Sequence, residues 1–337
     1  MKTIAKANMM DAIAILAQDA QVLVPMTVDG VSKFSLWGSE GTLDFSAVNT
    51  LLPPKDSLFP QTEKMYSYQV ENQAITSLAI HNEAKQQIIF GIRPCDMQSI
   101  QCMDDVFLTK TFVDDFYRVK REKLITVCIG CSKTAPTCFC DSMGGSPAGH
   151  GAADIQLCDL GNSYSVVAQT AAGQAVVEKW QGLVRDEEGS VPEVSCTLKV
   201  DVQGLPAQLS KMFNHPIWQE VSRKCIGCGT CTYLCPTCYC FDIDVQNNGN
   251  EGYRFRCWDS CMFSDYARMA GGHDPRPSKN ERIRNRFLHK LEYFNERYGK
   301  NLCVGCGRCL TKCPVHVDIT LFIDKVKEVS GIESVQL

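Results

Sequence analysis

The sequence contains no apolar run that approaches the ~18 residues needed to span a membrane as a helix. Its net charge of −4 gives no positive excess, which argues against nucleic acid as the main partner. No strand, GxGxxG turn and helix follow one another, so the chain shows no flavin or nicotinamide site of its own. A nucleophile elbow with serine, histidine and aspartate partners is also missing. The sequence therefore does not favour a membrane protein, a hydrolase or a self-contained flavoenzyme.

Cysteine, by contrast, is abundant, with 20 among 337 residues. The N-terminal segment carries Asp11 and Asp19 within its apolar stretch and has no small-residue cleavage site, so we expect no secretory signal. In a reducing compartment, thiols bind metals rather than pair as disulfides. We therefore expect a cytoplasmic protein whose cysteines hold metal.

Two cysteine runs have the spacing C-x₂-C-x₂-C-x₃-C-P, which is the ligand pattern of bacterial ferredoxins with two iron–sulfur clusters. Three thiolates on a tight, glycine-bearing loop bind one four-iron cluster, and the fourth cysteine of the run binds the other cluster. The runs thus predict one [4Fe-4S] cluster on Cys225, Cys228, Cys231 and Cys313, and a second on Cys303, Cys306, Cys309 and Cys235. Zinc sites more often show pairs of cysteines, and disulfides need an oxidising compartment, so both alternatives are less favoured.

The remaining sequence alternates strand-like and helix-like segments. Strands are expected at 22–26, 87–92 and 124–129, and helices at 4–18, 97–107 and 172–180. This alternation predicts an α/β domain with some parallel pairing. The expected fold class is α+β, with an N-terminal α/β domain over 1–210 and a two-cluster ferredoxin-like domain over 211–337.

A helical insertion is expected between the two ferredoxin runs. Its apolar stripe consists of Ile283, Phe287, Leu291 and Phe294. The opposite face carries the cations Arg282, Arg286, Lys290 and Arg297. These cations are interpreted either as a solvated helix face or as charges that offset negative clusters or dock an acidic partner.

A third cysteine group lies in the N-terminal part of the chain. Cys95 comes after the expected strand 87–92, and Cys131 comes after the expected strand 124–129. Ligand sites form at the carboxyl ends of parallel strands, so these two positions are expected to converge. With the following loop, they predict a third [4Fe-4S] cluster on Cys95, Cys131, Cys138 and Cys140, for which zinc is the alternative metal. Cys128 falls inside the strand and is expected to be buried and inert.

The other cysteines are expected to be structural. Cys102 is assigned to the core, and Cys158 and Cys196 are isolated in the sequence. The four cysteines that accompany the ferredoxin runs are interpreted as buried thiols near the clusters rather than ligands of a fourth cluster: Cys238, Cys240, Cys257 and Cys261.

The motifs together resemble a known family. The segments RPCD at 93–96, CFCDSMG at 138–144, WDSCMF at 258–263 and AGGHDPRP at 270–277, with the two ferredoxin runs, are similar to the beta subunits of cytoplasmic nickel–iron sulfhydrogenases and to an iron–sulfur subunit of anaerobic sulfite reductase. The resemblance covers about residues 87–320, and residues 1–86 carry no motif that contributes to it. It implies an electron-conducting subunit with about three cubane clusters, and it favours Cys131 over Cys128 as a ligand.

From these features we expect an electron-transfer subunit of a soluble oxidoreductase complex of anaerobic metabolism, without a catalytic residue of its own. Such a subunit passes electrons between a flavin- or NAD(P)-binding reductase partner and a catalytic partner of the hydrogenase or sulfite reductase type. The alternatives are a subunit of a heterodisulfide-reductase-associated flavin complex, a free ferredoxin-like carrier and a zinc-stabilised interaction protein.

Overall fold

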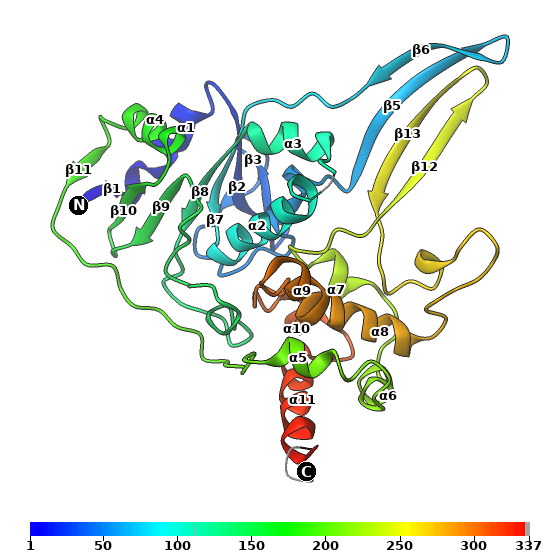
Figure 1. Cartoon of the computed structure of the whole chain (residues 1–337). Helices are drawn as coiled ribbons and strands as arrows, with labels where there is room; N and C mark the ends of the chain where they lie inside the picture. The colour runs from blue at the N-terminus through cyan, green and yellow to red at the C-terminus, as the bar shows by residue number, and fades with distance from the viewer. Residues whose placement is uncertain (111, 334–337) are drawn as a thin grey trace.

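The structure, a computed structural model, describes residues 1–110 and 112–333. Its largest element is a sheet whose strands span β1 Lys2–Ala5, β2 Gln21–Val28, β3 Val31–Leu36, β4 Thr42–Leu43, β7 Gln87–Ile92, β8 Leu124–Ile129, β9 Ile155–Asp159, β10 Ser163–Ala168 and β11 Val184–Asp186 (Figure 1). The order is β11-β1-β10-β9-β8-β7-β2-β3, with β4 paired to β2. The pairs β2–β7, β7–β8 and β8–β9 are parallel, so the carboxyl ends of these four strands share one edge.

The helices and helical turns span η1 Lys6–Asn8, α1 Met9–Leu16, η2 Pro54–Ser57, α2 Pro94–Leu108, α3 Asp115–Glu122, η3 Asp141–Met143, α4 Ala171–Lys179, α5 Leu205–Leu209, α6 Ile217–Ser222, α7 Thr230–Tyr233, η4 Asp265–Ala267, α8 Lys279–Leu288, the π-helical turn η5 His289–Tyr293, α9 Phe294–Tyr298, α10 Arg308–Lys312 and α11 Ile319–Glu333. Helices α1 and α4 cover one face of the large sheet, and α2 covers the other.

Side-chain alternation along the central strands explains this layering. On β8, Val127 and Ile129 pack beneath α1 and α4, whereas Leu124 and Cys128 pack beneath α2. Successive residues of a strand point to opposite faces, so a continuous apolar run fits a strand that is covered on both sides. The mixed fold predicted from the sequence, with parallel pairing in its N-terminal part, is confirmed.

A second sheet forms an arm that projects from the body at the upper right of Figure 1. Its strands are β5 Thr62–Glu71, β6 Ala74–Ile80, β12 Phe241–Asn248 and β13 Glu251–Trp258, in the antiparallel order β12-β13-β5-β6. The arm thus combines strands from both sides of residue 210. The division into domains at 210/211 stays a prediction.

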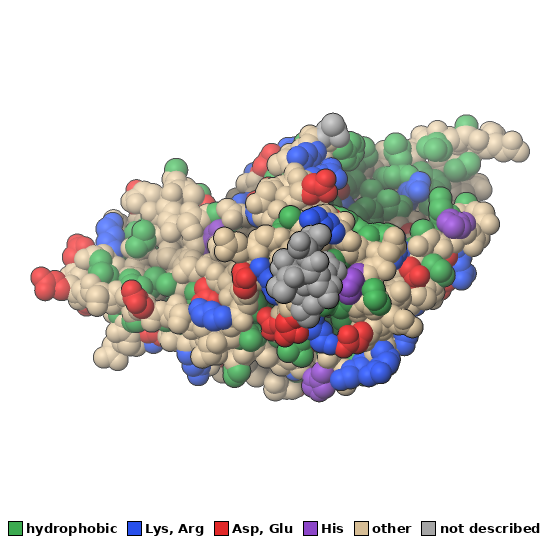
Figure 2. All heavy atoms as spheres, turned by 60° about the horizontal axis from the view of Figure 1, so that its bottom comes forward, with side chains coloured by type: hydrophobic (Ala, Val, Ile, Leu, Met, Phe, Trp, Pro, Cys, Tyr) green, Lys and Arg blue, Asp and Glu red, His purple; other side chains and the backbone are tan. Residues whose placement is uncertain are grey.

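The root of the arm is fixed by a buried arginine. Nε of Arg256 lies 2.5 Å from Glu63, and its Nη1 lies 2.6 Å from Asp114. Farther out, apolar side chains such as Leu78 and Ile80 are exposed. Figure 2 shows green side chains gathered where the arm meets the body.

Most of the predicted elements are present. The expected strands 87–92 and 124–129 coincide with β7 and β8, and the expected helices 97–107 and 172–180 lie within α2 and, apart from Trp180, within α4. The helix expected at 4–18 is wrong at its start, because residues 2–5 form β1 between β10 and β11. In the described part of the chain, no helix is long and apolar enough to cross a membrane.

The predicted helical insertion is confirmed by α8, the π-helical turn and α9. Ser278 begins α8 with a capping box, in which its side chain and that of Glu281 satisfy the first backbone amides. The predicted apolar stripe is fully buried, with no member more than 2% exposed: Ile283, Phe287, Leu291 and Phe294.

One buried ion pair connects the large sheet to the C-terminal half. Asp96, in the first turn of α2, accepts two hydrogen bonds from the guanidinium of Arg308 at 2.6 and 2.8 Å. Nε of Arg308 also donates to the carbonyl of Thr50 at 2.8 Å. Both charged side chains are almost completely buried, so neither charge has water as an alternative partner.

We expect Asp96→Asn to lower the free energy of unfolding by about 3–5 kcal/mol, because the Arg308 charge stays buried without its counter-charge. Urea denaturation followed by circular dichroism measures this loss. Glu220→Gln, which breaks the exposed pair with Lys325, is the matched control and should leave the midpoint unchanged. An unchanged midpoint for Asp96→Asn would contradict the structural role of the pair.

Candidate metal centres

Four cysteines line one buried cavity, which we call the second centre: Cys235, Cys303, Cys306 and Cys309. The last three lie on the loop that leads into α10, and Cys235 follows α7. Burial raises the pKa of Cys303, Cys306 and Cys309 to about 12. The cavity therefore gathers sulfur donors that lose their protons when metal binds. These are the four cysteines that the sequence assigns to one cluster, three from one run and one from the other.

The first centre comprises Cys225, Cys228, Cys231 and Cys313. Burial raises the pKa of Cys231, and the charges of Cys225 and Cys228 add to this effect, so these three thiols are neighbours. Cys313 ends α10, which packs against α7, the helix that contains Cys231. Backbone amides face the sulfurs: Gly227 N–H donates to Cys225 Sγ and Val317 N–H to Cys313 Sγ, at 3.4 and 3.2 Å. Cys228 is exposed, so this centre reaches the surface.

The third centre contains the predicted set Cys95, Cys131, Cys138 and Cys140. Cys95 lies in the first turn of α2 after β7, and Cys131 lies just after β8, so the carboxyl ends of two parallel strands bring them together. Arg93 holds the surrounding loops through the carbonyls of Phe45 and Ala47, both at 2.6 Å.

Further contacts define the third centre's lining. Cys95, Cys138 and Cys140 belong to one buried cluster of side chains, and Cys131 is an electrostatic neighbour of Cys95 and Cys140. Cys128 lies within β8 and is completely buried, as the sequence predicts.

Cys196 also belongs to the third centre, although the sequence suggested an isolated structural thiol. Its Sγ lies 3.6 Å from Cys140 Sγ, and the residue is 2% exposed. The expectation of isolation is wrong because a segment without regular structure brings Cys196 back across the loop that carries Cys138 and Cys140. No spacing motif could have revealed this approach over 56 residues.

The second and third centres adjoin each other through their loops. Phe139 N–H donates to the carbonyl of Gly305 at 2.9 Å. A Cβ atom on Gly305 would lie 2.5 Å from the Phe139 carbonyl, and one on Gly307 would lie 2.4 Å from the Thr137 carbonyl oxygen. Both glycines have positive φ, at 65° and 75°. Glycine is therefore needed twice over, for the backbone conformation and for the close approach.

Asn49 connects the same two centres, and sequence reasoning missed it because residues 1–86 carry no motif. Its Nδ2 donates to the Cys306 carbonyl at 2.7 Å and approaches Cys138 Sγ at 3.8 Å. Its Oδ1 lies 3.7 Å from Cys95 Sγ. One side chain thus contacts sulfur atoms of the third centre and backbone of the second.

Cations of the helical insertion are buried beside the thiols. Arg286 and Lys290 are 4% and 2% exposed, so the interpretation of a solvated face is wrong for them, whereas Arg297 is exposed. Burial lowers the pKa of Lys290, but the negative charges of Cys235 and Cys238 more than offset this, and its pKa is raised. Lys55, from the N-terminal half, is also buried and donates to the Cys238 carbonyl at 2.9 Å.

The additional cysteines of the C-terminal half surround the second centre. The Cys238 thiol donates to Cys235, and Cys240 accepts hydrogen bonds from Cys261 and Tyr266. The hydrogen bond from the Cys261 side chain is the main cause that lowers the pKa of Cys240 to about 6. Cys257 lies apart on β13, facing Asp242 of β12.

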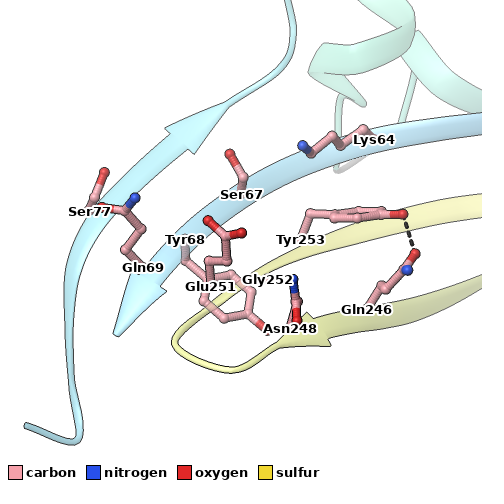
Figure 3. A pocket seen from close by; sticks show the side chains of 10 residues that line it. All are labelled: Lys64, Ser67, Tyr68, Gln69, Ser77, Gln246, Asn248, Glu251, Gly252 and Tyr253. Carbon is pink, nitrogen blue, oxygen red and sulfur yellow. Dashed lines mark hydrogen bonds between the residues drawn. The ribbon is translucent and has the colours of Figure 1, made fainter. Parts of the chain in front are cut away.

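A separate groove on the arm is lined by polar side chains of β5, β6, β12 and β13, with no cysteine among its ten lining residues (Figure 3). Tyr253 donates a hydrogen bond to Gln246 at its edge. Among the residues that the structure describes, no group of three or more His, Cys, Asp or Glu side chains is close enough to hold a single metal ion. The thiol groups, rather than the groove, are the chemically distinctive sites.

Comparison with known proteins points to the same chemistry. The model of a 4Fe-4S dicluster domain matches residues 224–317, which contain the first and second centres. Sulfhydrogenase 2 subunit beta of Pyrococcus furiosus is 30% identical over 326 residues, which cover 93% of this chain and 94% of that protein. No solved structure matches the chain significantly.

We expect Gly305→Ala to destabilise the contact between the second and third centres, because the new methyl group overlaps the Phe139 backbone. A loss of about 1–3 kcal/mol is typical for such overpacking, and a thermal unfolding scan measures it as a lower Tm. Gly299→Ala is the control, since Gly299 also has positive φ but has open space around its Cβ direction. Equal Tm values for the two variants would show that the close approach contributes nothing.

Proposed function

Because the chain belongs to the family of sulfhydrogenase beta subunits, we propose that it relays electrons within a multi-subunit oxidoreductase complex. Its partners in this proposal are a reductase subunit that binds flavin or NAD(P), together with a catalytic subunit of the hydrogenase or sulfite reductase type. The observation that carries the proposal is the succession of three adjoining thiol groups within one chain. The unpaired state of every described cysteine supports a reducing compartment, which we take to be the cytoplasm.

Each centre has the donors of a [4Fe-4S] cluster, which carries single electrons when bound. The first centre offers Cys225, Cys228, Cys231 and Cys313, and the second offers Cys235, Cys303, Cys306 and Cys309. The third offers Cys131, Cys138 and Cys140, with Cys95 as the fourth thiol predicted from the sequence. The structure adds Cys196 as a second candidate for that fourth position.

The contacts between centres define an order. The second centre adjoins the third through Asn49 and the Gly305 loop. It adjoins the first because Cys231 and Cys309 are electrostatic neighbours and both face Arg286. The second centre therefore lies between the other two, and electrons pass through it from one end of the chain of centres to the other.

The exposed end of this succession supports a docking point. Cys228 is exposed, and its neighbour Ile226 is 62% exposed. Electron transfer requires close approach, so a redox partner gains from meeting the first centre at this surface. The chain supplies position, burial and charge around the centres, and the proposal assigns no proton transfer or covalent step to its side chains.

Metal analysis of anaerobically purified protein tests the proposal directly. We expect about twelve iron atoms and a matching amount of acid-labile sulfide per chain, because three four-iron clusters are proposed. About eight iron atoms would remove the third cluster from the proposal. Zinc in place of iron would overturn the relay altogether, and native size-exclusion showing only a lone chain active as a carrier would overturn the role within a complex.

The crossed ligation makes a sharper prediction. We expect Cys313→Ala to damage the cluster on Cys225, Cys228 and Cys231, although Cys313 is closer in sequence to the cysteines of the second centre. Electron paramagnetic resonance of the reduced protein distinguishes the clusters, and iron should fall by up to about four atoms per chain. Cys158→Ala, which removes a buried cysteine away from the first and second centres, is the control. Selective loss of the second-centre signal in Cys313→Ala would show that the assignment is wrong.

A further inference from the structure

The third centre contains more thiols than a four-iron cluster needs. Five cysteines converge there: Cys95, Cys131, Cys138, Cys140 and Cys196. A [4Fe-4S] cluster in a ferredoxin-like site takes four thiolates. The structure therefore poses a choice between Cys95 and Cys196, because Cys138 and Cys140 share one short loop and Cys131 neighbours both.

The segment around Cys196 is fixed over the loop of Cys138 and Cys140. It belongs to the long connection that leads from β11 to α5 (Figure 1). The Cys196 N–H donates to Asp141 at 2.8 Å, and the Val200 N–H donates to Ser142 at 3.1 Å. On the other side of Cys196, Thr134 donates to the Ser195 carbonyl at 3.1 Å. These bonds on both sides of Cys196 hold its backbone in place.

The Cys196 thiol points into the group rather than away from it. Its Sγ is 3.6 Å from Cys140 Sγ, and the side chain has almost no contact with solvent. It is also an electrostatic neighbour of Cys131 and Cys138. Cys196 is thus close to all three thiols that either ligand set includes.

Cys95 lies differently. Its Sγ contacts the side chain of Asn49 at 3.7 Å, and the nearest thiol influence on it is Cys306 of the second centre, ahead of Cys131. The Asp96 carboxylate, next in sequence, adds a negative charge beside it. A thiolate at Cys95 would stand next to that carboxylate, so the position is less suited to an anionic ligand.

We propose that Cys196, with Cys131, Cys138 and Cys140, binds the cluster of the third centre, and that Cys95 is not a ligand but lies between the third and second centres. This inference rests on the proposed third cluster. It makes the connection between β11 and α5 part of a metal site, so the ordering of that connection and the binding of the cluster are coupled.

The test compares single variants of the full chain, purified anaerobically. Iron per chain and the electron paramagnetic resonance spectrum of the reduced protein are measured for Cys196→Ala, Cys95→Ala and Cys158→Ala. We expect Cys196→Ala to lose about four of about twelve iron atoms, while the other two variants keep about twelve. Retained signals of the first and second centres in Cys196→Ala show that the variant is folded.

Cys196→Ser provides a second readout, because a serine oxygen replaces the sulfur with little change in volume. A ligand at this position changes the third-centre spectrum on conversion to serine, whereas a thiol that only fills space leaves the spectrum unaltered. Wild-type iron and spectra in both Cys196 variants would overturn the inference, as would loss of about four iron atoms in Cys95→Ala. About eight iron atoms in the wild type would instead remove the third cluster itself, and this inference with it.

Discussion

The contact between the loop 303–309 and the loop 137–140 is the constraint on which the placement of all three centres depends. The two loops come from opposite halves of the chain, yet backbone meets backbone without an intervening side chain. Only glycine permits this approach at Gly305 and Gly307, where φ is positive and a Cβ has no room. The Asp96–Arg308 pair fixes the same junction from the side, since Asp96 follows Cys95 and Arg308 lies between Cys306 and Cys309.

The buried cations show why metal binding and folding are coupled in this region. Burying a charge costs several kcal/mol unless an opposite charge compensates it. Among the described residues, Arg308 has a carboxylate partner, whereas Lys55, Arg286 and Lys290 have neutral hydrogen-bond acceptors. Their negative counter-charges are the cysteine thiolates around them. The cations therefore favour deprotonated, metal-bound cysteines, and the bound state in turn compensates the cations.

The sequence predicted the elements and groupings that depend on local spacing. The repeated cysteine run, the strands β7 and β8 and the apolar stripe of the insertion are local patterns with a direct physical reading. What the sequence could not predict depends on long-range docking. Asn49 and Cys196 have no spacing signal, because segments distant in sequence bring them to the third centre. Arg286 and Lys290 lie on a helix with a conventional amphipathic pattern, and only the packing of the insertion against the cysteine loops buries them.

The helical insertion explains how a ferredoxin-like pair of centres is adapted to a larger protein. It buries the second centre, and burial in a low-dielectric interior disfavours the added negative charge of reduction. The same insertion places Arg286 and Lys290, four residues apart and so on one helix face, beside the thiols that it covers. Covering and charge compensation thus come from one element. The first centre keeps an exposed edge at Cys228, while the N-terminal half covers the other end. This asymmetry gives the succession of centres two chemically different ends, as a relay between two unlike partners requires.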